Sequence, residues 1–454
     1  MNEDLITRAA DEVARFRATV EERPVAPPVD FDALRDGFDS PLPLEPTPPD
    51  VVLEEMIAAA DPGLTASVGP RYFGFVIGGA LPAATAADLV VLGWDQAAFN
   101  ATLSPASVAV EQVAGGWAKE LLGIPETASV GFVTGAQEAN SVGLAVARHH
   151  VLEEAGWDVE KDGLSGAPPI RVVASEERHS TIDRSLRLLG IGTSCIVPVR
   201  ADANGAVDVV HLEEVLAQTE GPTIVCLQSG NVNTGACDDL ERASELAHAR
   251  GAWVHVDGAF GLWAAASPEF SHLTTGIDQP DSWGCDAHKW LNVPYDSGLV
   301  FVSRPDVHAA SMTNVAAYLV GHGQGTLGGA DFVLGSSRRA RGFAVWAAIR
   351  ELGRSGIADL VERNCALARR FADQLRDAGA DIANEVVLNQ VLVSFGDDDT
   401  TDAVIDRVQR DGTCWMGPTT WRGRRYMRIS VSNHSTTEAD VDRSVEAIVR
   451  CWRP

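Results

Sequence analysis

The sequence predicts an α/β fold with a mostly parallel central sheet, followed by a smaller α+β domain. Between about residues 68 and 315, short apolar runs alternate with helical patterns, which is typical of a sheet built from strand–helix units. Polar or small residues directly follow several of these runs, as they do where parallel strands border a ligand crevice. At 454 residues the chain is long enough for two or three packed units.

The first 67 residues are expected to form an N-terminal arm. Residues 1–22 predict a short helix, because its apolar residues fall near one face: Leu5, Ala9, Val13, Phe16 and Val20. Eight prolines follow between Pro24 and Pro49, which indicates an extended strap rather than a core element.

Residues 68–341 are expected to form the large α/β domain. Its strands are predicted at residues 130–133, 170–174, 223–227, 253–256 and 299–302. Helical patterns separate these runs, which favours crossover connections and therefore parallel strands.

Residues 342–454 are expected to form linking helices and the small domain. Helices are predicted over 342–352 and 357–378, with a break marked by Gly353 and Gly356. Strands are predicted at 386–395 and 426–431, with a helix over 401–410 between them. Thr437 and Asp440 form a capping box that predicts the start of a final helix.

Lys289 is one of only three lysines in the chain, and its neighbours differ from those of a surface lysine. It lies between a buried-looking run that ends in Asp257 and the apolar run 299–302. Arginine can replace lysine as a charge but cannot form a Schiff base. Taken alone, Lys289 would be interpreted as a loop lysine in a salt bridge, so its function depends on the motifs around it.

Asp257 ends a predicted strand that follows a helical stretch at 239–250. His255 and Asp257 share one strand face, since strand residues two apart point the same way. The simpler alternative is an acid that caps the next turn. An acid and Lys289 at successive strand ends, however, are what pyridoxal phosphate (PLP) requires, because the lysine forms the Schiff base and the carboxylate holds the pyridine nitrogen protonated.

Two further motifs suit the same cofactor. The run 130–133 is followed by Thr134, Gly135 and Ala136 and then by a helical pattern, and free backbone N–H groups at a helix start bind phosphate. Most such turns only begin a helix, and neither a Gly-x-Gly-x-x-Gly motif nor a Walker lysine is present. His179 precedes an amphipathic helix, where its flat ring either stacks on a pyridine ring or hydrogen-bonds the helix start.

The order of these motifs resembles the PLP-dependent group II amino acid decarboxylases, which include the aromatic amino acid and glutamate decarboxylases. The resemblance extends from about Pro70 to Ser432 and is most specific in the block Asp-Ala-His-Lys-Trp-Leu-Asn-Val-Pro-Tyr-Asp at 286–296. It implies the aspartate aminotransferase-like fold, known as fold type I. It also implies that an amino acid displaces Lys289, forms an external aldimine with PLP and loses CO2.

The resemblance also implies a role for each site residue. Lys289, His179 and Asp257 are implied as the catalytic residues, with Asp257 on the pyridine nitrogen and His179 on one ring face. The other implied cofactor contacts are Ala259 on the second face, His288 beside the phosphate or the Schiff base, and Gly135, Ala136 and Gln137 around the phosphate. The family usually has Gly-Gly-Ser/Thr there, so Gln137 lacks the hydroxyl that would contact the phosphate.

Phe332 departs from the family pattern. In the family, a loop tyrosine that follows an aspartate, shortly before an Arg-Arg pair, donates a proton after CO2 loss. Here Asp331 is followed by Phe332, and in members with this change oxygen intercepts the carbanion and an aldehyde forms. Alternatively, Tyr318 or His322 donates the proton. The five glycines of residues 320–329 predict a flexible lid.

Several functions therefore remain open. The first is an amino acid decarboxylase, and the alternatives are an aldehyde-forming oxidative deaminase or a transaminase on the same scaffold, or a PLP-binding protein without turnover. Tyr72, Phe73 and Phe75 either indicate an apolar or aromatic substrate or belong to the core. Arg428 is equally compatible with a carboxylate-binding and a structural role.

Composition limits the partners. A net charge of −27 argues against nucleic acid and anionic membranes, and no apolar run approaches membrane-spanning length. The beginning of the chain lacks a signal-peptide pattern, and seven cysteines without metal-ligand spacing favour free thiols in a reducing cytoplasm and no metal site. The arm and strap, together with the family resemblance, imply a homodimer.

Overall fold

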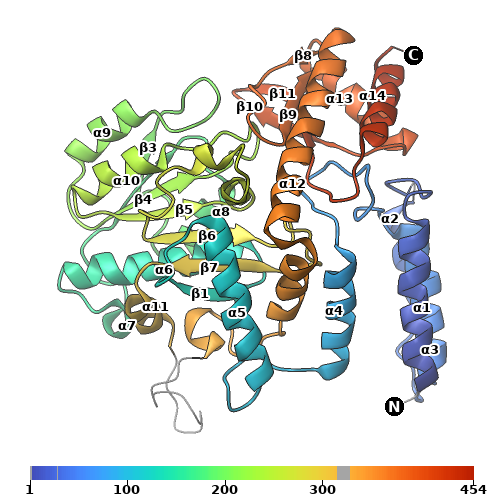
Figure 1. Cartoon of the computed structure of the whole chain (residues 1–454), viewed down its shortest axis with the longest axis horizontal. Coiled ribbons are helices and arrows are strands. Elements are labelled where there is room, and N and C mark those ends of the chain that lie inside the picture. The colour runs from blue at the N-terminus through green and yellow to red at the C-terminus, as the bar shows by residue number, and fades with distance from the viewer. Residues whose placement is uncertain (1–2, 28, 314–327, 454) are drawn as a thin grey trace. The chain divides into compact units, whose positions relative to one another are not determined.

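The computed structural model describes residues 3–27, 29–313 and 328–453 (Figure 1). The chain divides into two compact units. The smaller unit comprises residues 1–79, 367–383 and 391–454, and the larger unit comprises residues 80–366 and 384–390.

The larger unit is built on a seven-stranded sheet. Its strands are β1 (Ser129–Val133), β2 (Arg171–Ser175), β3 (Ile196–Val199), β4 (Thr223–Gln228), β5 (Trp253–Asp257), β6 (Ser282–Asp286) and β7 (Gly298–Val302). They lie in the order β1-β7-β6-β5-β4-β2-β3, with β3, β2, β4, β5 and β6 parallel and β7 antiparallel to both of its neighbours. The predicted α/β class and mostly parallel sheet are confirmed.

Two strands of this sheet were not predicted. β6 has the sequence Ser-Trp-Gly-Cys-Asp, and β3 has the sequence Ile-Val-Pro-Val. β6 is buried at all five positions although it has only two large or apolar side chains, because helices and neighbouring strands cover it from both sides. A strand of this kind carries no periodic apolar signal, so its position is determined by pairing with β5 and β7.

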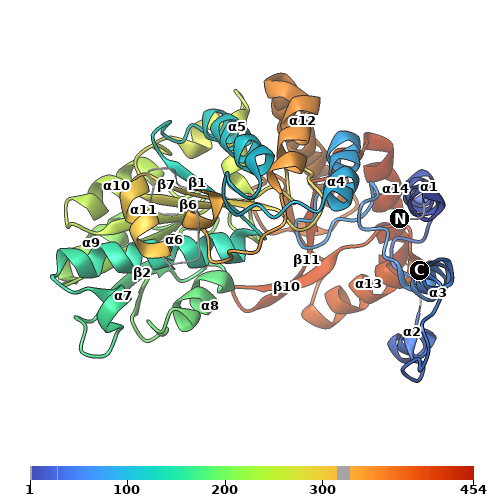
Figure 2. The same cartoon turned by 90° about the horizontal axis from the view of Figure 1, so that it is seen from below.

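Helices cover both faces of the sheet (Figure 2). In chain order up to α11, the helices of the larger unit are α4 (Pro82–Trp94), α5 (Pro105–Leu122), α6 (Ala136–Glu154), α7 (Val159–Asp162), α8 (Ser180–Leu188), α9 (Val209–Gln218), α10 (Leu240–His248) and α11 (Pro305–Met312). α6 lies on one face against β5, β6 and β7, while α5 lies on the other. Ala139, Val142 and Val146 of α6 are fully buried, as their helical spacing predicts.

The smaller unit contains a four-stranded sheet in the order β10-β11-β9-β8. Its strands are β8 (Asp381–Ile382), β9 (Gln390–Ser394), β10 (Gly417–Trp421) and β11 (Arg424–Ser430), and its helices include α13 (Asp398–Asp411) and α14 (Glu438–Trp452). α14 begins at the predicted Thr437–Asp440 capping box. The helix α12 (Gly342–Asp377) has the predicted break at Gly353, whose φ of 61° is not helical.

The N-terminal segment is less extended than its prolines indicate. It forms α1 (Glu3–Thr19), α2 (Phe31–Phe38) and α3 (Pro49–Ala60). α2 corrects the prediction of an extended strap. Residues 29–40 contain no proline, and the Asp30 side chain caps α2 by accepting the Asp32 N–H.

Arg71 holds this segment to the C-terminal part of the same unit. The side chain is 6% exposed. It donates to the carbonyl oxygens of Glu21 at 2.7 Å and Thr413 at 2.8 Å and to the Asp440 carboxylate at 3.2 Å. Three separate segments therefore meet on one guanidinium.

Among the described residues, no helix combines the length and apolar character needed to cross a bilayer.

Candidate active site

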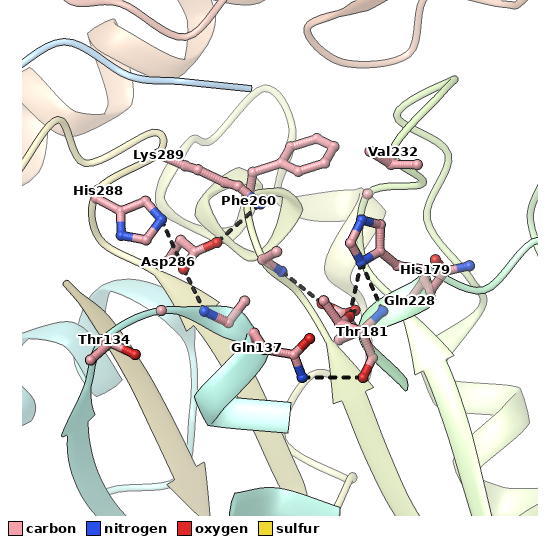
Figure 3. Close-up of a pocket in the computed structure, with 15 residues that line it drawn as sticks. Thr134, Gln137, His179, Thr181, Gln228, Val232, Phe260, Asp286, His288 and Lys289 are labelled. Carbon is pink, nitrogen blue, oxygen red and sulfur yellow. Dashed lines mark hydrogen bonds and ion pairs between the residues drawn. The ribbon is translucent and has the colours of Figure 1, made fainter. Parts of the chain in front are cut away.

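A cavity of about 320 Å³ lies in the larger unit, at the carboxyl ends of β4, β5 and β6 and beside the first turn of α6 (Figure 3). The eight residues that the family resemblance implies as catalytic or cofactor contacts all line it: Gly135, Ala136, Gln137, His179, Asp257, Ala259, His288 and Lys289. Parallel strands bring their carboxyl ends to one edge of a sheet, and for that reason Ala136 and Asp286, 150 residues apart in the chain, meet here.

Asp286 is a site residue that sequence reasoning did not identify. It is the last residue of β6 and is 2% exposed. One oxygen lies 3.0 Å from Lys289 Nζ, and the other accepts the Ala136 N–H at 2.5 Å and lies 3.3 Å from His288 Nε2. The sequence signal that could have identified Asp286 was its position three residues before Lys289. It was missed because β6 was not recognised as a strand.

The turn between β1 and α6 approaches the lysine segment closely. A Cβ added to Gly135 would lie 2.8 Å from His288 Cε1 and 3.0 Å from Asp286 Oδ1, so only glycine fits without a shift. The Asp286 carboxylate on the Ala136 N–H shows that the start of α6 receives an anionic group. The backbone at this turn is thus suited to a phosphate.

Gln137 directs its amide away from that turn. Its Nε2 donates to Ser185 Oγ at 2.9 Å and to the Thr181 carbonyl at 3.3 Å, both on α8. The side chain therefore ties α6 to α8, and its backbone N–H is the group left to contact a phosphate.

Asp257 and His179 face the cavity from β5 and from the start of α8. Asp257 is 6% exposed, and its oxygens accept the Ala259 N–H and the Thr181 hydroxyl, each at 3.3 Å. His179 is the N-cap of α8, with Nδ1 accepting the Thr181 N–H at 3.3 Å. His179 thus caps the start of α8 and also lines the cavity.

The surroundings of His288, the histidine beside the lysine, favour its neutral form. Burial lowers the pKa of His288, and the nearby Asp286 carboxylate opposes this shift only in part. His288 Nδ1 accepts the Ser297 N–H at 3.2 Å, and its ring stacks on Tyr295 at a centroid distance of 4.2 Å. The ring is consequently fixed at the edge of the cavity next to Gly135.

Phe332 is not among the residues that line this cavity. It ends the short 3₁₀ helix Gly329–Phe332, where its ring packs on His308 at 5.0 Å and its carbonyl accepts from His308 Nε2 at 2.9 Å. The expectation that Phe332 occupies the position of the proton-donating tyrosine therefore stays a prediction, since Phe332 does not line the cavity of its own chain. Tyr318, His322 and most of the glycine-rich segment 320–329 lie outside the described residues.

The three aromatic residues considered for substrate contact lie in the smaller unit. Tyr72 stacks on Trp415 at a centroid distance of 4.9 Å, and Phe73 packs edge-on against Phe371. Both are core residues, which was one of the two interpretations. Phe75 is different, because it is 61% exposed and has a φ of 54°, a left-handed conformation that is rare for a bulky residue.

Arg428 lies on β11, where its backbone pairs with Gly417. Burial lowers the pKa of its guanidinium. This position in the smaller unit does not decide between the carboxylate-binding and structural interpretations.

Residues 32–396 match the family model described as "Pyridoxal-dependent decarboxylase conserved domain". The chain therefore belongs to the pyridoxal-dependent decarboxylase family. It is an enzyme of the PLP-dependent carboxy-lyase class, with pyridoxal phosphate as its cofactor. The residues around the cavity fit this cofactor, since they combine a lysine, a buried acid and a glycine turn at a helix start.

Curated relatives match nearly the whole chain. Tryptophan decarboxylase 1 of Oryza sativa subsp. japonica is 28% identical, over 97% of this chain and 91% of its own length. The 4-hydroxyphenylacetaldehyde synthase of Rhodiola rosea is 26% identical, over 95% of this chain and 91% of its own length. The solved structure of Oryza sativa TDC with PLP and tryptamine has a TM-score of 0.92 and 25% identity, and covers 100% of this chain and 98% of that one.

Proposed function

We propose that this enzyme decarboxylates an L-amino acid and that Lys289 is the lysine that binds PLP. The observation that carries the proposal is the meeting of Lys289, Asp257 and His179 around one cavity beside the start of α6. When bound, PLP supplies the electron sink for loss of CO2. The choice of reaction then depends on how the protein orients the substrate.

The residues of this chain have separable roles in the proposal. Asp257 holds the pyridine nitrogen, and His179 and Ala259 confine the ring between them. Asp286 keeps Lys289 Nζ at 3.0 Å, at the edge of the cavity, from where the amine is able to carry a proton to or from the substrate carbon. Gly135 and Gln137 offer backbone N–H groups to the phosphate, and Ala136, whose N–H donates to Asp286, lines the same turn.

An aromatic side chain is the substrate class that we propose first. The relatives are named as tryptophan decarboxylases, aromatic-L-amino-acid decarboxylases and aromatic aldehyde synthases. Phe260 and Val232 give the cavity apolar walls (Figure 3). An indole or phenyl ring gains more from such walls than a charged side chain does.

The test is a product analysis with the purified protein. PLP and each common amino acid are supplied, and carbon dioxide, amine, aldehyde, ammonia and hydrogen peroxide are quantified. We expect carbon dioxide from tryptophan, tyrosine or phenylalanine in preference to glutamate. Carbon dioxide from none of the amino acids, with PLP bound to Lys289, would contradict decarboxylation.

Aldehyde formation is the second candidate, because two kinds of aldehyde synthase occur among the relatives that match this chain. The same assay separates the two outcomes. A decarboxylase releases amine and carbon dioxide, whereas an aldehyde synthase consumes oxygen and water and releases aldehyde, carbon dioxide, ammonia and hydrogen peroxide.

We also propose that the enzyme is a homodimer. α4 presents large apolar side chains to solvent, with Leu89, Val90, Leu92 and Trp94 between 41% and 61% exposed. A contiguous set of such residues on one helix is typical of a surface that another protein covers. A second copy of this chain is the partner that the N-terminal arm and the family resemblance favour.

A further inference from the structure

A line of hydrogen bonds connects Asp257 to a buried histidine behind the cavity. The Thr181 hydroxyl lies 3.3 Å from Asp257 Oδ2 and receives the Asn140 Nδ2 amide at 3.1 Å. Asn140 Oδ1 in turn lies 3.0 Å from His255 Nε2. Asn140 and His255 are both 0% exposed, so no solvent molecule competes for these groups at the protein surface.

The packing around this line fixes its geometry. A Cβ on Gly143 of α6 would lie 2.5 Å from His255 Cε1, and a Cβ on Gly284 of β6 would lie 2.7 Å from Asn140 Oδ1. Two glycines therefore allow α6 to approach β5 and β6 closely enough for Asn140 to reach His255.

The hydrogen bonds all point one way. Because the Asn140 amide nitrogen faces Thr181, its oxygen faces His255, and His255 Nε2 must carry a hydrogen to donate to it. Ser282 Oγ accepts the Trp253 indole N–H at 2.9 Å, which leaves its own hydrogen for His255 Nδ1 at 2.9 Å. A neutral imidazole has one donor and one acceptor, so His255 accepts from Ser282 and donates to Asn140. Every hydrogen bond in the line is therefore donated in the direction of the cavity.

The last hydrogen in the line has two acceptors. The Thr181 hydroxyl accepts from Asn140 and has a single hydrogen to give. It can give this hydrogen to Asp257 Oδ2 at 3.3 Å or to His179 Nδ1 at 2.9 Å. These two side chains are the ones that would meet the edge and the face of the PLP ring, so one hydroxyl contacts both and donates its hydrogen to one of them at a time.

We propose that Thr181 and Asn140 are positioning residues for the Asp257–His179 pair. Thr181 orients the carboxylate and the imidazole toward the PLP ring, and Asn140 determines the direction in which the Thr181 hydroxyl donates. The inference rests on the proposed function, because the pair acts on PLP bound at Lys289.

The first test compares Thr181→Val with Thr181→Ser in the PLP-loaded enzyme. Valine keeps the shape and removes the hydroxyl, while serine keeps the hydroxyl. We expect Thr181→Val to change the absorption spectrum of bound PLP, to weaken PLP binding on the order of 10-fold and to lower kcat more than it changes KM. Thr181→Ser should restore the spectrum, and Ser180→Ala, which alters an exposed neighbouring hydroxyl, is the matched control.

The second test reverses the line rather than cutting it. Asn140→Asp replaces the amide donor with an oxygen that accepts, so the Thr181 hydroxyl turns toward residue 140 and leaves Asp257 and His179. We expect the same change in the PLP spectrum as in Thr181→Val. The double variant should add little to it, because both changes remove the same contact.

Three results would overturn the proposal. One is a wild-type PLP spectrum and kcat in Thr181→Val, the second is a failure of Thr181→Ser to restore either, and the third is additive spectral effects in the double variant. Failure of the proposed function gives a different result. The wild-type enzyme would then bind PLP at Lys289 without turning over any amino acid, while the spectral comparison of the variants could still be made.

Discussion

At the scale of single residues, Lys289 gives the most direct prediction. Borohydride reduction of the PLP-loaded enzyme should attach the cofactor to the peptide that contains Lys289, because this is the lysine that lines the cavity. Peptide mass spectrometry measures the site. Lys119 and Lys161 are internal controls, and cofactor attached to either of them instead would contradict the assignment.

Asp257 gives a second prediction at this scale. Asp257→Ala should lower kcat by about 10²–10³-fold, because the pyridine nitrogen loses the charged partner that stabilises the electron sink. Steady-state kinetics with saturating PLP measures the effect. Asp278→Ala, which removes an exposed acid of the same unit, should leave kcat unchanged. Near-normal turnover in Asp257→Ala would show that the nitrogen has another partner.

Lys289, Asp257 and the Gly135 turn were accessible to sequence reasoning because each lies at the end of an apolar run or between two such runs. Asp286 and Thr181 were not, since their roles come from contacts with residues distant in the chain. Asp286 bonds to Ala136 across 150 positions, and Thr181 bonds to Asp257 across 76. The roles of the eight predicted residues still await the experiments above.

At the scale of secondary-structure elements, strands with a local apolar pattern were predicted, and strands whose position depends on contacts with distant residues were not. β1, β4, β5 and β7 are rich in apolar residues, and their positions follow from composition alone. β6 is recognisable only once α6 is packed beside it, because Gly284 is there to leave room for Asn140. Phe332 is a different case, because a short loop motif gave its expected position, and packing against His308 keeps it out of the cavity of its own chain. The expectation stays a prediction.

The packing of α6 on β5 predicts a pH dependence of stability. Burial lowers the pKa of His255 to about 4, whereas an unfolded histidine titrates near 6.5. Between these values the unfolded chain binds a proton that the folded chain does not, so stability is fully present above about pH 6.5 and is lost as the pH falls toward 4. Lowering the pH from 7 to 5 should cost about 2 kcal/mol through His255.

Urea unfolding of wild type and His255→Gln at pH 7 and pH 5 measures this contribution. Many carboxylates also titrate over this range, so the informative quantity is the difference between the two proteins. The variant should be less stable at pH 7 and should lose less on acidification. An equal loss in both proteins would show that His255 does not carry the effect.

At the scale of the whole molecule, the apolar face of α4 predicts association. Leu92→Glu should weaken the proposed dimer by about 2 kcal/mol or more, because a charge would be buried at the centre of the interface. Light scattering across a dilution series measures the change. Leu188→Glu is the matched control, since Leu188 of α8 is 70% exposed and lies outside the proposed interface.

The N-terminal arm gives a companion experiment. Removal of residues 1–50 should weaken dimerisation and PLP retention together, because we expect the N-terminal arm to clasp the second subunit of the proposed homodimer. A truncated protein that stays fully active as a monomer would contradict both the arm's role and the homodimer.

Strand β7, which is antiparallel to both of its neighbours, contains a glycine whose substitution we expect to inactivate the enzyme. Its first residue, Gly298, pairs with Val133 on one side and Asp286 on the other, and a Cβ there would lie 2.6 Å from Gly135 Cα. One methyl group at position 298 would push the turn at Gly135 away from the segment that carries Lys289. We expect a chain with alanine at position 298 to be inactive even though all of its recognisable catalytic motifs are intact. A search for those motifs alone would classify such a chain as an active enzyme.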